Sequence, residues 1–137
     1  MRVKTRKGVF ELLPDSWANY RRLYVDVFSV AASLSYPEEL FKSAAEAGVN
    51  VVFVVDAWHE SHMRLARRYL ELCRRYGLEC RLSEQKPAEA YAVELCEAEC
   101  DGECAVLTKD YDAALRAERC AVLLFRGGRL WRASRQR

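Results

Sequence analysis

Apolar residues along the chain form short runs, which alternate with stretches where apolar residues recur every three or four positions. The β-branched run at residues 50–55 (NVVFVV) predicts a strand that is buried on both faces. Residues 60–76 instead place apolar side chains at i, i+4, i+7 and i+11 from Leu65, which is typical of an amphipathic helix. Gly77 is a typical residue to end that helix.

The same reading predicts further strands and helices in alternation. Strands are expected at residues 23–28, 78–82, 104–108, 120–125 and 129–133, and helices at residues 35–47, 87–99 and 110–117, with an unassigned apolar segment at 10–13. Ser35 is expected to cap the first of these helices, with Pro37 in its first turn and Gly48 at its end. Gly127-Gly128 favours a hairpin turn.

Strands that alternate with helices usually form a parallel sheet with helices on both faces. The sequence therefore predicts an α/β fold, a three-layer α/β/α domain with a mostly parallel central sheet. A chain of 137 residues has the size of one domain, so we expect residues 1–137 to form a single unit.

No apolar run approaches the roughly 18 residues that a membrane span needs. The start MRVKTRKGVF is basic but lacks the apolar stretch of a signal peptide. We therefore expect a cytoplasmic protein with no membrane contact.

Charge is distributed unevenly, although the net charge is only +2. The terminal segments 1–7 and 126–137 hold nine of the 22 basic residues and none of the 20 acidic ones. Basic ends on an acidic body suit a partner with phosphates, such as nucleic acid. Charged termini are just as commonly only solvated.

Arginine outnumbers lysine 17 to 5, and asparagine and glutamine are scarce, a composition that hints at a thermophile. The six cysteines lack the paired CxxC spacing of a zinc site. Structural thiols or a disulfide are the expected alternatives, and hyperthermophile interiors can be rich in disulfides. Cys104 and Cys120 open two strands that should be neighbours, so we expect a bridge among the six thiols.

Acidic residues follow the predicted strands. Asp26, Asp56 and Asp110 lie at or just past a strand end, Asp112 is two residues further, and Glu89 lies in a first helical turn. Any one of them could be a helix cap or a turn residue. Sites in open α/β sheets form beyond the carboxyl ends of the strands, so we expect these five acids to converge. Crowded carboxylates repel unless a cation lies among them, and oxygen ligands favour Mg²⁺ or Mn²⁺.

Residues 77–115 resemble the catalytic core of the flap-endonuclease family within the PIN-like nucleases. KPAEAYA resembles the family's Pro-x-Glu-Ala segment and carries Glu89, and TKDYD resembles its paired aspartates. Upstream, LYVDVFS and VVFVVDAWHESHMRLARR resemble its first two strands, with Asp26 and Asp56 as their acids. The resemblance spans about residues 22–125, with every element in order.

The resemblance implies a metal-dependent nuclease that hydrolyses phosphodiester bonds in DNA or RNA. By this likeness Asp26, Glu89 and Asp110 would hold a first Mg²⁺ or Mn²⁺ ion. Asp56 and Asp112 would complete or share a second, and Asp26, Glu89, Asp110 and Asp112 would be catalytic.

Basic and imidazole side chains follow Asp56. Arg64, Arg67 and Arg68 are placed to neutralise a substrate phosphate, or else form a solvated helix face. His59 and His62 are expected to have loop or helix-cap roles, because metals in the family take oxygen ligands.

The chain also departs from the family pattern. Tyr91 stands where a second Glu is usual, and no acid follows Glu118 to supply a downstream aspartate. The main alternative is a catalytically degenerate PIN-like domain that binds nucleic acid or protein. A haloacid-dehalogenase-type phosphatase would need an acid at Phe28, and a response-regulator receiver would need an acidic pair and an isolated lysine. The sequence leaves a homo-oligomer or a protein partner open.

Overall fold

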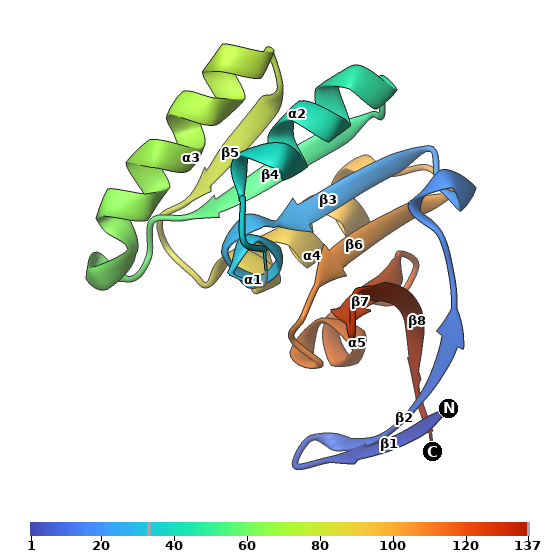
Figure 1. Cartoon of the computed structure of the whole chain (residues 1–137). Coiled ribbons are helices and arrows are strands. Elements are labelled where there is room, and N and C mark those ends of the chain that lie inside the picture. Colours follow the sequence, from blue (N-terminus) through green and yellow to red (C-terminus); the bar gives the residue numbers. More distant parts are fainter. Residues whose placement is uncertain (33, 137) are drawn as a thin grey trace.

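The computed structural model describes residues 1–32 and 34–136, which form one mixed sheet of eight strands with five α-helices (Figure 1). The strand order is β1-β2-β8-β7-β6-β3-β4-β5. The strands are β1 (Arg2–Thr5), β2 (Gly8–Pro14), β3 (Arg22–Asp26), β4 (Val51–Asp56), β5 (Glu79–Ser83), β6 (Cys104–Thr108), β7 (Ala121–Arg126) and β8 (Arg129–Arg135).

Parallel and antiparallel pairing occupy different parts of the sheet. The strands β7, β6, β3, β4 and β5 pair in parallel, whereas β1, β2 and β8 add three antiparallel pairings at one side. The predicted α/β class is confirmed, and the sheet is mixed. The antiparallel part arises because the hairpins β1–β2 and β7–β8 meet along β2 and β8.

Helices divide between two apolar clusters. One cluster includes residues of α1, α2 and α3, and the other includes residues of α4 and α5. The helices are α1 (Val27–Ala31), α2 (Glu38–Ala47), α3 (Met63–Tyr76), α4 (Ala88–Glu99) and α5 (Asp112–Arg116), and the 3-10 turns are η1 (Trp17–Asn19) and η2 (Glu60–His62). In the described residues no helix has the length and apolar character needed to cross a membrane.

Strand β4 shows why the apolar run at 50–55 folds as predicted. Val52 and Val54 belong to the cluster that includes α4, whereas Phe53 and Val55 belong to the cluster that includes α3. Successive side chains of a strand point to opposite faces, and here both faces are buried. Such a strand is uniformly apolar and ends where its first polar residue reaches the sheet edge.

Two helix starts differ from the sequence prediction. Pro37, not Ser35, occupies the N-cap position of α2, and α3 begins after the turn η2. Leu65 was predicted on the buried face of α3, but its exposed fraction is 45% and the adjacent Ala66 is buried. The buried face of α3 is formed by Ala66, Tyr69, Leu72 and Cys73, and Leu65 lies outside it.

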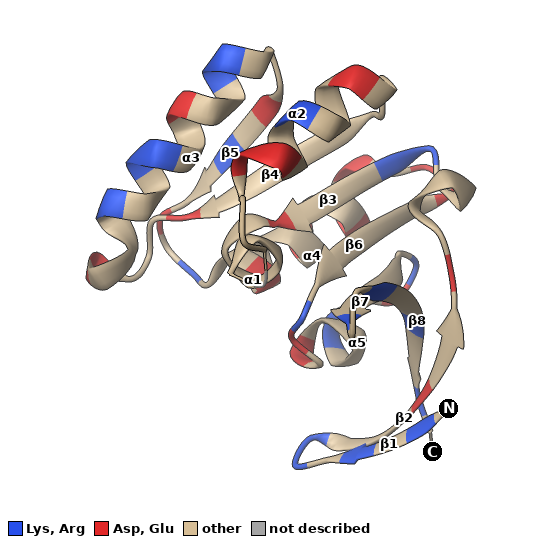
Figure 2. Cartoon of the chain, viewed as in Figure 1, with Lys and Arg blue, Asp and Glu red and all other residues tan. Residues whose placement is uncertain are grey.

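The basic terminal segments are part of the sheet. Residues 2–5 form β1 and residues 129–135 form β8, and their arginines and lysines lie on these strands (Figure 2). Gly127 and Gly128 have φ angles of 60° and 74°, which fit the predicted hairpin turn. These segments therefore cannot be removed without dismantling strands.

The expected bridge among the six thiols is confirmed, because all six cysteines form disulfides. Cys104 begins β6 and Cys120 directly precedes the neighbouring β7, and each bonds to a cysteine near the end of α4. Every bridge includes a residue at the amino-terminal side of β5, β6 or β7. The pairs are Cys73–Cys80, Cys96–Cys120 and Cys100–Cys104.

Candidate functional site

The acidic residues singled out in the sequence occupy the predicted edge of the sheet. Asp26 and Asp56 are the last residues of β3 and β4. Asp110 follows β6, Asp112 begins α5 and Glu89 lies in the first turn of α4. Because β3, β4 and β6 run in parallel, their carboxyl ends meet on one side of the sheet. Within this edge the five side chains do not form one cluster.

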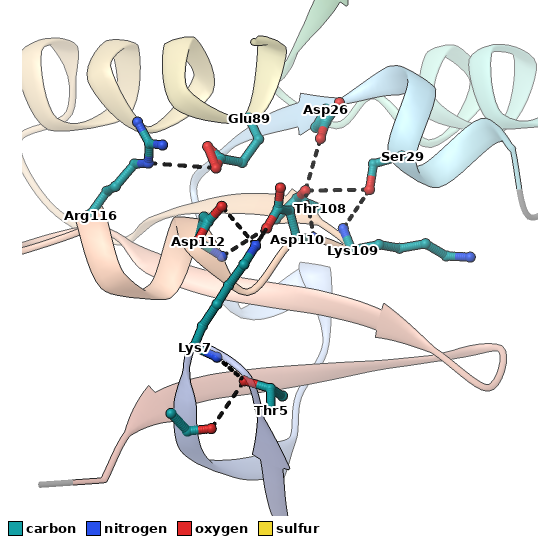
Figure 3. Close-up of polar contacts among 11 residues, drawn as sticks. Thr5, Lys7, Asp26, Ser29, Glu89, Thr108, Lys109, Asp110, Asp112 and Arg116 are labelled. Carbon is teal, nitrogen blue, oxygen red and sulfur yellow. Dashed lines mark hydrogen bonds and ion pairs between the residues drawn. The ribbon is translucent and has the colours of Figure 1, made fainter.

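Three of the carboxylates meet closely. Glu89, Asp110 and Asp112 each offer an oxygen that lies within 4.8 Å of the other two (Figure 3). Glu89 is buried, with an exposed fraction of 5%, while the side chains of Asp110 and Asp112 are 40% and 33% exposed. This three-carboxylate group is therefore buried at Glu89 and open to solvent at Asp110 and Asp112.

Ionisation of the Glu89 carboxyl group is unfavourable in this position. The pKa of Glu89 is raised to about 7, mainly by burial, with Arg116 opposing the shift and the charges of Asp110 and Asp112 contributing to it. The nearest guanidinium nitrogen of Arg116, Nε, lies 3.6 Å from Glu89 Oε1. Glu89 Oε2 is buried and has no hydrogen-bond partner. An oxygen of this kind, beside two further carboxylates, is suited to a cation.

Asp26 lies at the same edge but outside the three-carboxylate group. Its Oδ2 accepts a hydrogen bond from Thr108 Oγ1 at 2.9 Å. The pKa of Asp26 is raised to about 6, mainly by burial, while the hydrogen bond from Thr108 opposes the shift and the charges of Asp56 and Asp110 contribute to it. The carboxyl group is thus held in a buried position next to the cluster, with Thr108 between it and Asp110.

Two hydroxyl residues that sequence reasoning missed hold this edge together. Thr108 Oγ1 accepts a hydrogen bond from the backbone N–H of Asp110 at 3.1 Å while donating to Asp26. Ser29 Oγ accepts from the backbone N–H of Lys109 at 2.6 Å (Figure 3). The polar Thr108 at the end of the apolar β6 was the available signal in the sequence.

Lys7 also enters the site without having been predicted. It lies in the turn between β1 and β2, and its Nζ is 2.9 Å from Asp110 Oδ1 and 2.7 Å from Asp112 Oδ2 (Figure 3). Hydrogen bonds to Asp112 and then to Asp110 raise the pKa of Lys7. An ammonium group therefore neutralises the open side of the three-carboxylate group.

A groove of about 400 Å³ lies beside Asp110. Both acidic and basic side chains reach it, so it places positive charge directly next to a carboxylate of the site. Its lining residues are Thr5, Arg6, Lys7, Ser29, Lys109, Asp110 and Tyr111.

Asp56 belongs to a second group at the same edge, with His59 and His62. Asp56 Oδ2 lies 2.9 Å from His59 Nδ1 and 3.6 Å from His62 Nδ1. Burial opposes ionisation of Asp56, but hydrogen bonds from the His59 ring and from the backbone N–H groups of Trp58 and His59 lower its pKa overall. The histidines occupy the N-cap positions of η2 and α3, but their side chains make no capping hydrogen bond and their rings face Asp56 instead.

The predicted basic residues lie further along α3. Arg64, Arg67 and Arg68 are exposed, and none of them makes an ion pair within residues 1–32 and 34–136. Tyr91, which replaces an acid of the resembled family, is half-buried against the cluster that includes α4. A scan against models of known protein families found no match to the chain, and a search of curated proteins found none similar to it.

Proposed function

We propose that this chain is a divalent-metal-dependent nuclease that hydrolyses phosphodiester bonds in DNA or RNA. In this proposal the fold is PIN-like, with a three-layer α/β/α core around the parallel strands β7, β6, β3, β4 and β5. One observation carries the proposal. The buried Glu89 has an unpartnered Oε2 and meets Asp110 and Asp112 within 4.8 Å at the carboxyl edge of the sheet.

The residues at this edge fit a hard divalent cation. Glu89, Asp110 and Asp112 offer only oxygen ligands, which favour Mg²⁺ or Mn²⁺. The raised pKa of Glu89 reflects, first, the burial of its carboxyl group and, to a lesser extent, the negative charge of Asp110 and Asp112. When bound, the ion supplies a lowered pKa for a coordinated water and charge stabilisation at the phosphate.

The protein's own residues have separate roles in this proposal. Glu89, Asp110 and Asp112 hold the ion, and Asp26 provides a further catalytic carboxyl group positioned by Thr108. Asp56 serves a second ion. The family likeness of KPAEAYA and TKDYD supports the assignment of these acids.

Substrate binding draws on the positive charge around the carboxylates. Arg6, Lys7 and Lys109 line the groove beside Asp110 and would neutralise phosphates close to the ion. Arg64 and Arg67, with Arg68, extend this charge along the exposed side of α3. Neutralising phosphates releases counterions, so substrate affinity should fall steeply with salt.

A second candidate is a catalytically degenerate PIN-like domain that binds nucleic acid or protein. Lys7 favours this candidate, since its ammonium group bridges Asp110 and Asp112 and so replaces the positive charge of a metal ion. Tyr91 favours it as well, because an oxygen ligand of the resembled family is lost there. The two candidates differ in whether metal can displace Lys7.

A cleavage assay tests the proposal. Labelled single-stranded and flap substrates of DNA and RNA are incubated with Mg²⁺, Mn²⁺ or a chelator, using wild type, Glu89→Gln and Glu94→Gln. Glu94 is the matched control, because it lies exposed on the same helix and pairs with Lys86. A nuclease gives metal-dependent cleavage that Glu89→Gln reduces by about 100-fold or more and Glu94→Gln preserves. Binding of these substrates without any cleavage would support the degenerate module instead.

A further inference from the structure

The two histidines of this chain, His59 and His62, face the same carboxylate oxygen. Their Nδ1 atoms lie 2.9 Å and 3.6 Å from Asp56 Oδ2, and their ring centroids are 4.9 Å apart. The short turn η2 brings this about by reversing the chain between β4 and α3. Two nitrogen donors and one oxygen donor therefore lie within 4.8 Å of one another.

These separations match those of ligands around a small transition-metal ion. Donor atoms about 2.1 Å from one ion, at tetrahedral angles, lie about 3.4 Å from each other. The distances of 2.9 Å and 3.6 Å from Asp56 Oδ2 fall on either side of that value. Asp56 itself is positioned independently, because its Oδ1 accepts backbone hydrogen bonds from Trp58 and His59 at 2.8 Å and 3.2 Å.

A simple aspartate–histidine ion pair accounts for only part of this arrangement. His59 Nδ1 hydrogen-bonds to Asp56 Oδ2 and would satisfy that role alone. His62 Nδ1 is buried and has no hydrogen-bond partner, although it points at the same oxygen. The His62 ring is held there by stacking on Phe28, with centroids 4.6 Å apart. The buried nitrogen of His62 therefore lacks the partner that an ion between the three groups would provide.

We propose that Asp56, His59 and His62 form a second metal site, selective for a borderline transition ion such as Zn²⁺. Imidazole nitrogen and a single carboxylate favour Zn²⁺ or Co²⁺ over Mg²⁺, which separates this site from the oxygen-only group at Glu89. Asp56 also takes part in the proposed nuclease site, but the inference of a transition-metal site does not depend on nuclease activity. Three protein ligands leave a coordination position open, and the side chains of His59 and His62 are 48% and 37% exposed.

The disulfides simplify the measurement of transition-metal binding at Asp56, His59 and His62. Because all six cysteines are bonded in the structure, an oxidised sample offers no thiolate to compete for a transition ion. The two histidines are likewise the only imidazoles in the chain. Imidazole NMR resonances therefore report on this one location, and cobalt absorption is assigned to it by its loss in the histidine variants.

The test is a titration of the oxidised full chain with Co²⁺, followed by displacement with Zn²⁺. Wild type should bind one Co²⁺ through nitrogen and oxygen ligands, with both imidazole spin systems shifting together. His59→Ala and His62→Ala should each weaken binding at least tenfold, and the neighbouring Glu60→Gln should not. Glu89→Gln should leave the cobalt signal intact even if it abolishes cleavage, so failure of the nuclease does not count against this site. Cobalt binding unaffected by both histidine substitutions, or no binding by the folded wild type, would overturn the proposal.

Discussion

Thr108 Oγ1 donates a hydrogen bond to Asp26 Oδ2 at 2.9 Å and accepts one from the backbone N–H of Asp110 at 3.1 Å. The neighbouring strands β3 and β6 are thus connected at their carboxyl ends by one hydroxyl group. Asp26 and Asp110 are 84 residues apart in sequence, and this hydroxyl sets their relative position.

Replacing Thr108 by Val should lower the free energy of unfolding by about 1–3 kcal/mol, because the buried Asp26 would lose its donor. Urea denaturation at neutral pH measures the change. Thr108→Ser keeps the hydroxyl and is the control, with a smaller loss expected. No loss in Thr108→Val would show that the hydrogen bonds of the hydroxyl contribute no net stability.

Glu89 should make the metal-free protein less stable as pH rises. Its pKa is raised from 4.5 to about 7 in the folded state, so the folded protein holds a proton that the unfolded chain has released. The favourable contribution of the protonated group is complete below about pH 4.5 and is lost as pH rises through 7. Glu89→Gln should therefore gain stability relative to wild type between pH 5 and pH 8 in the presence of a chelator. A difference that does not change with pH would contradict the raised pKa.

Divalent metal should stabilise the wild type and offset the loss of stability that ionised Glu89 causes. At a concentration ten times the dissociation constant, Mg²⁺ or Mn²⁺ should add about 1.4 kcal/mol and raise the melting temperature by roughly 3–8 °C. Asp110→Asn should lose most of the shift, because it removes one of the three close carboxylates. Thermal denaturation with and without metal gives the comparison, and an equal shift in Asp110→Asn would place the ion elsewhere.

Lys7→Ala should strengthen metal binding by about five- to thirtyfold, since two partly exposed ion pairs of about 0.5–1 kcal/mol each compete with the ion. Calorimetric titration with Mn²⁺ measures the affinity. Lys4→Ala is the matched control, as Lys4 is exposed on β1 and makes no ion pair within the described part of the chain. Weaker binding in Lys7→Ala would mean that Lys7 supports the site and does not compete for it.

The sequence was informative about which acidic residues lie at the strand ends, and less so about the distances between their side chains. Asp26 and Asp56 could be placed because each is the first acidic residue after an apolar run, and parallel strands bring such ends to one edge. Their division between two groups depends on side-chain directions, which periodicity does not specify. Asp56 turns toward the histidines because the short turn η2 folds back over it.

Lys7 could not be anticipated for a different reason. The segment that contains it has the charge of a solvated terminus, and its position follows from the pairing of β2 with β8, more than 100 residues away in sequence. A contact over such a separation leaves no local pattern. The disulfide partners of Cys104 and Cys120 lie only 4 and 24 residues away in sequence, near the end of α4, and cysteine spacing alone did not identify them.

The strand order also bears on how the protein is made. Within the described residues the hairpin β1–β2 joins the sheet through β8, which is synthesised after the other seven strands. On the ribosome, the parallel strands and their carboxylates can therefore assemble before the first hairpin docks. In that order of folding, Lys7 contacts Asp110 and Asp112 only after the hairpin has docked. A metal ion that binds the carboxylates before this step meets no competing lysine.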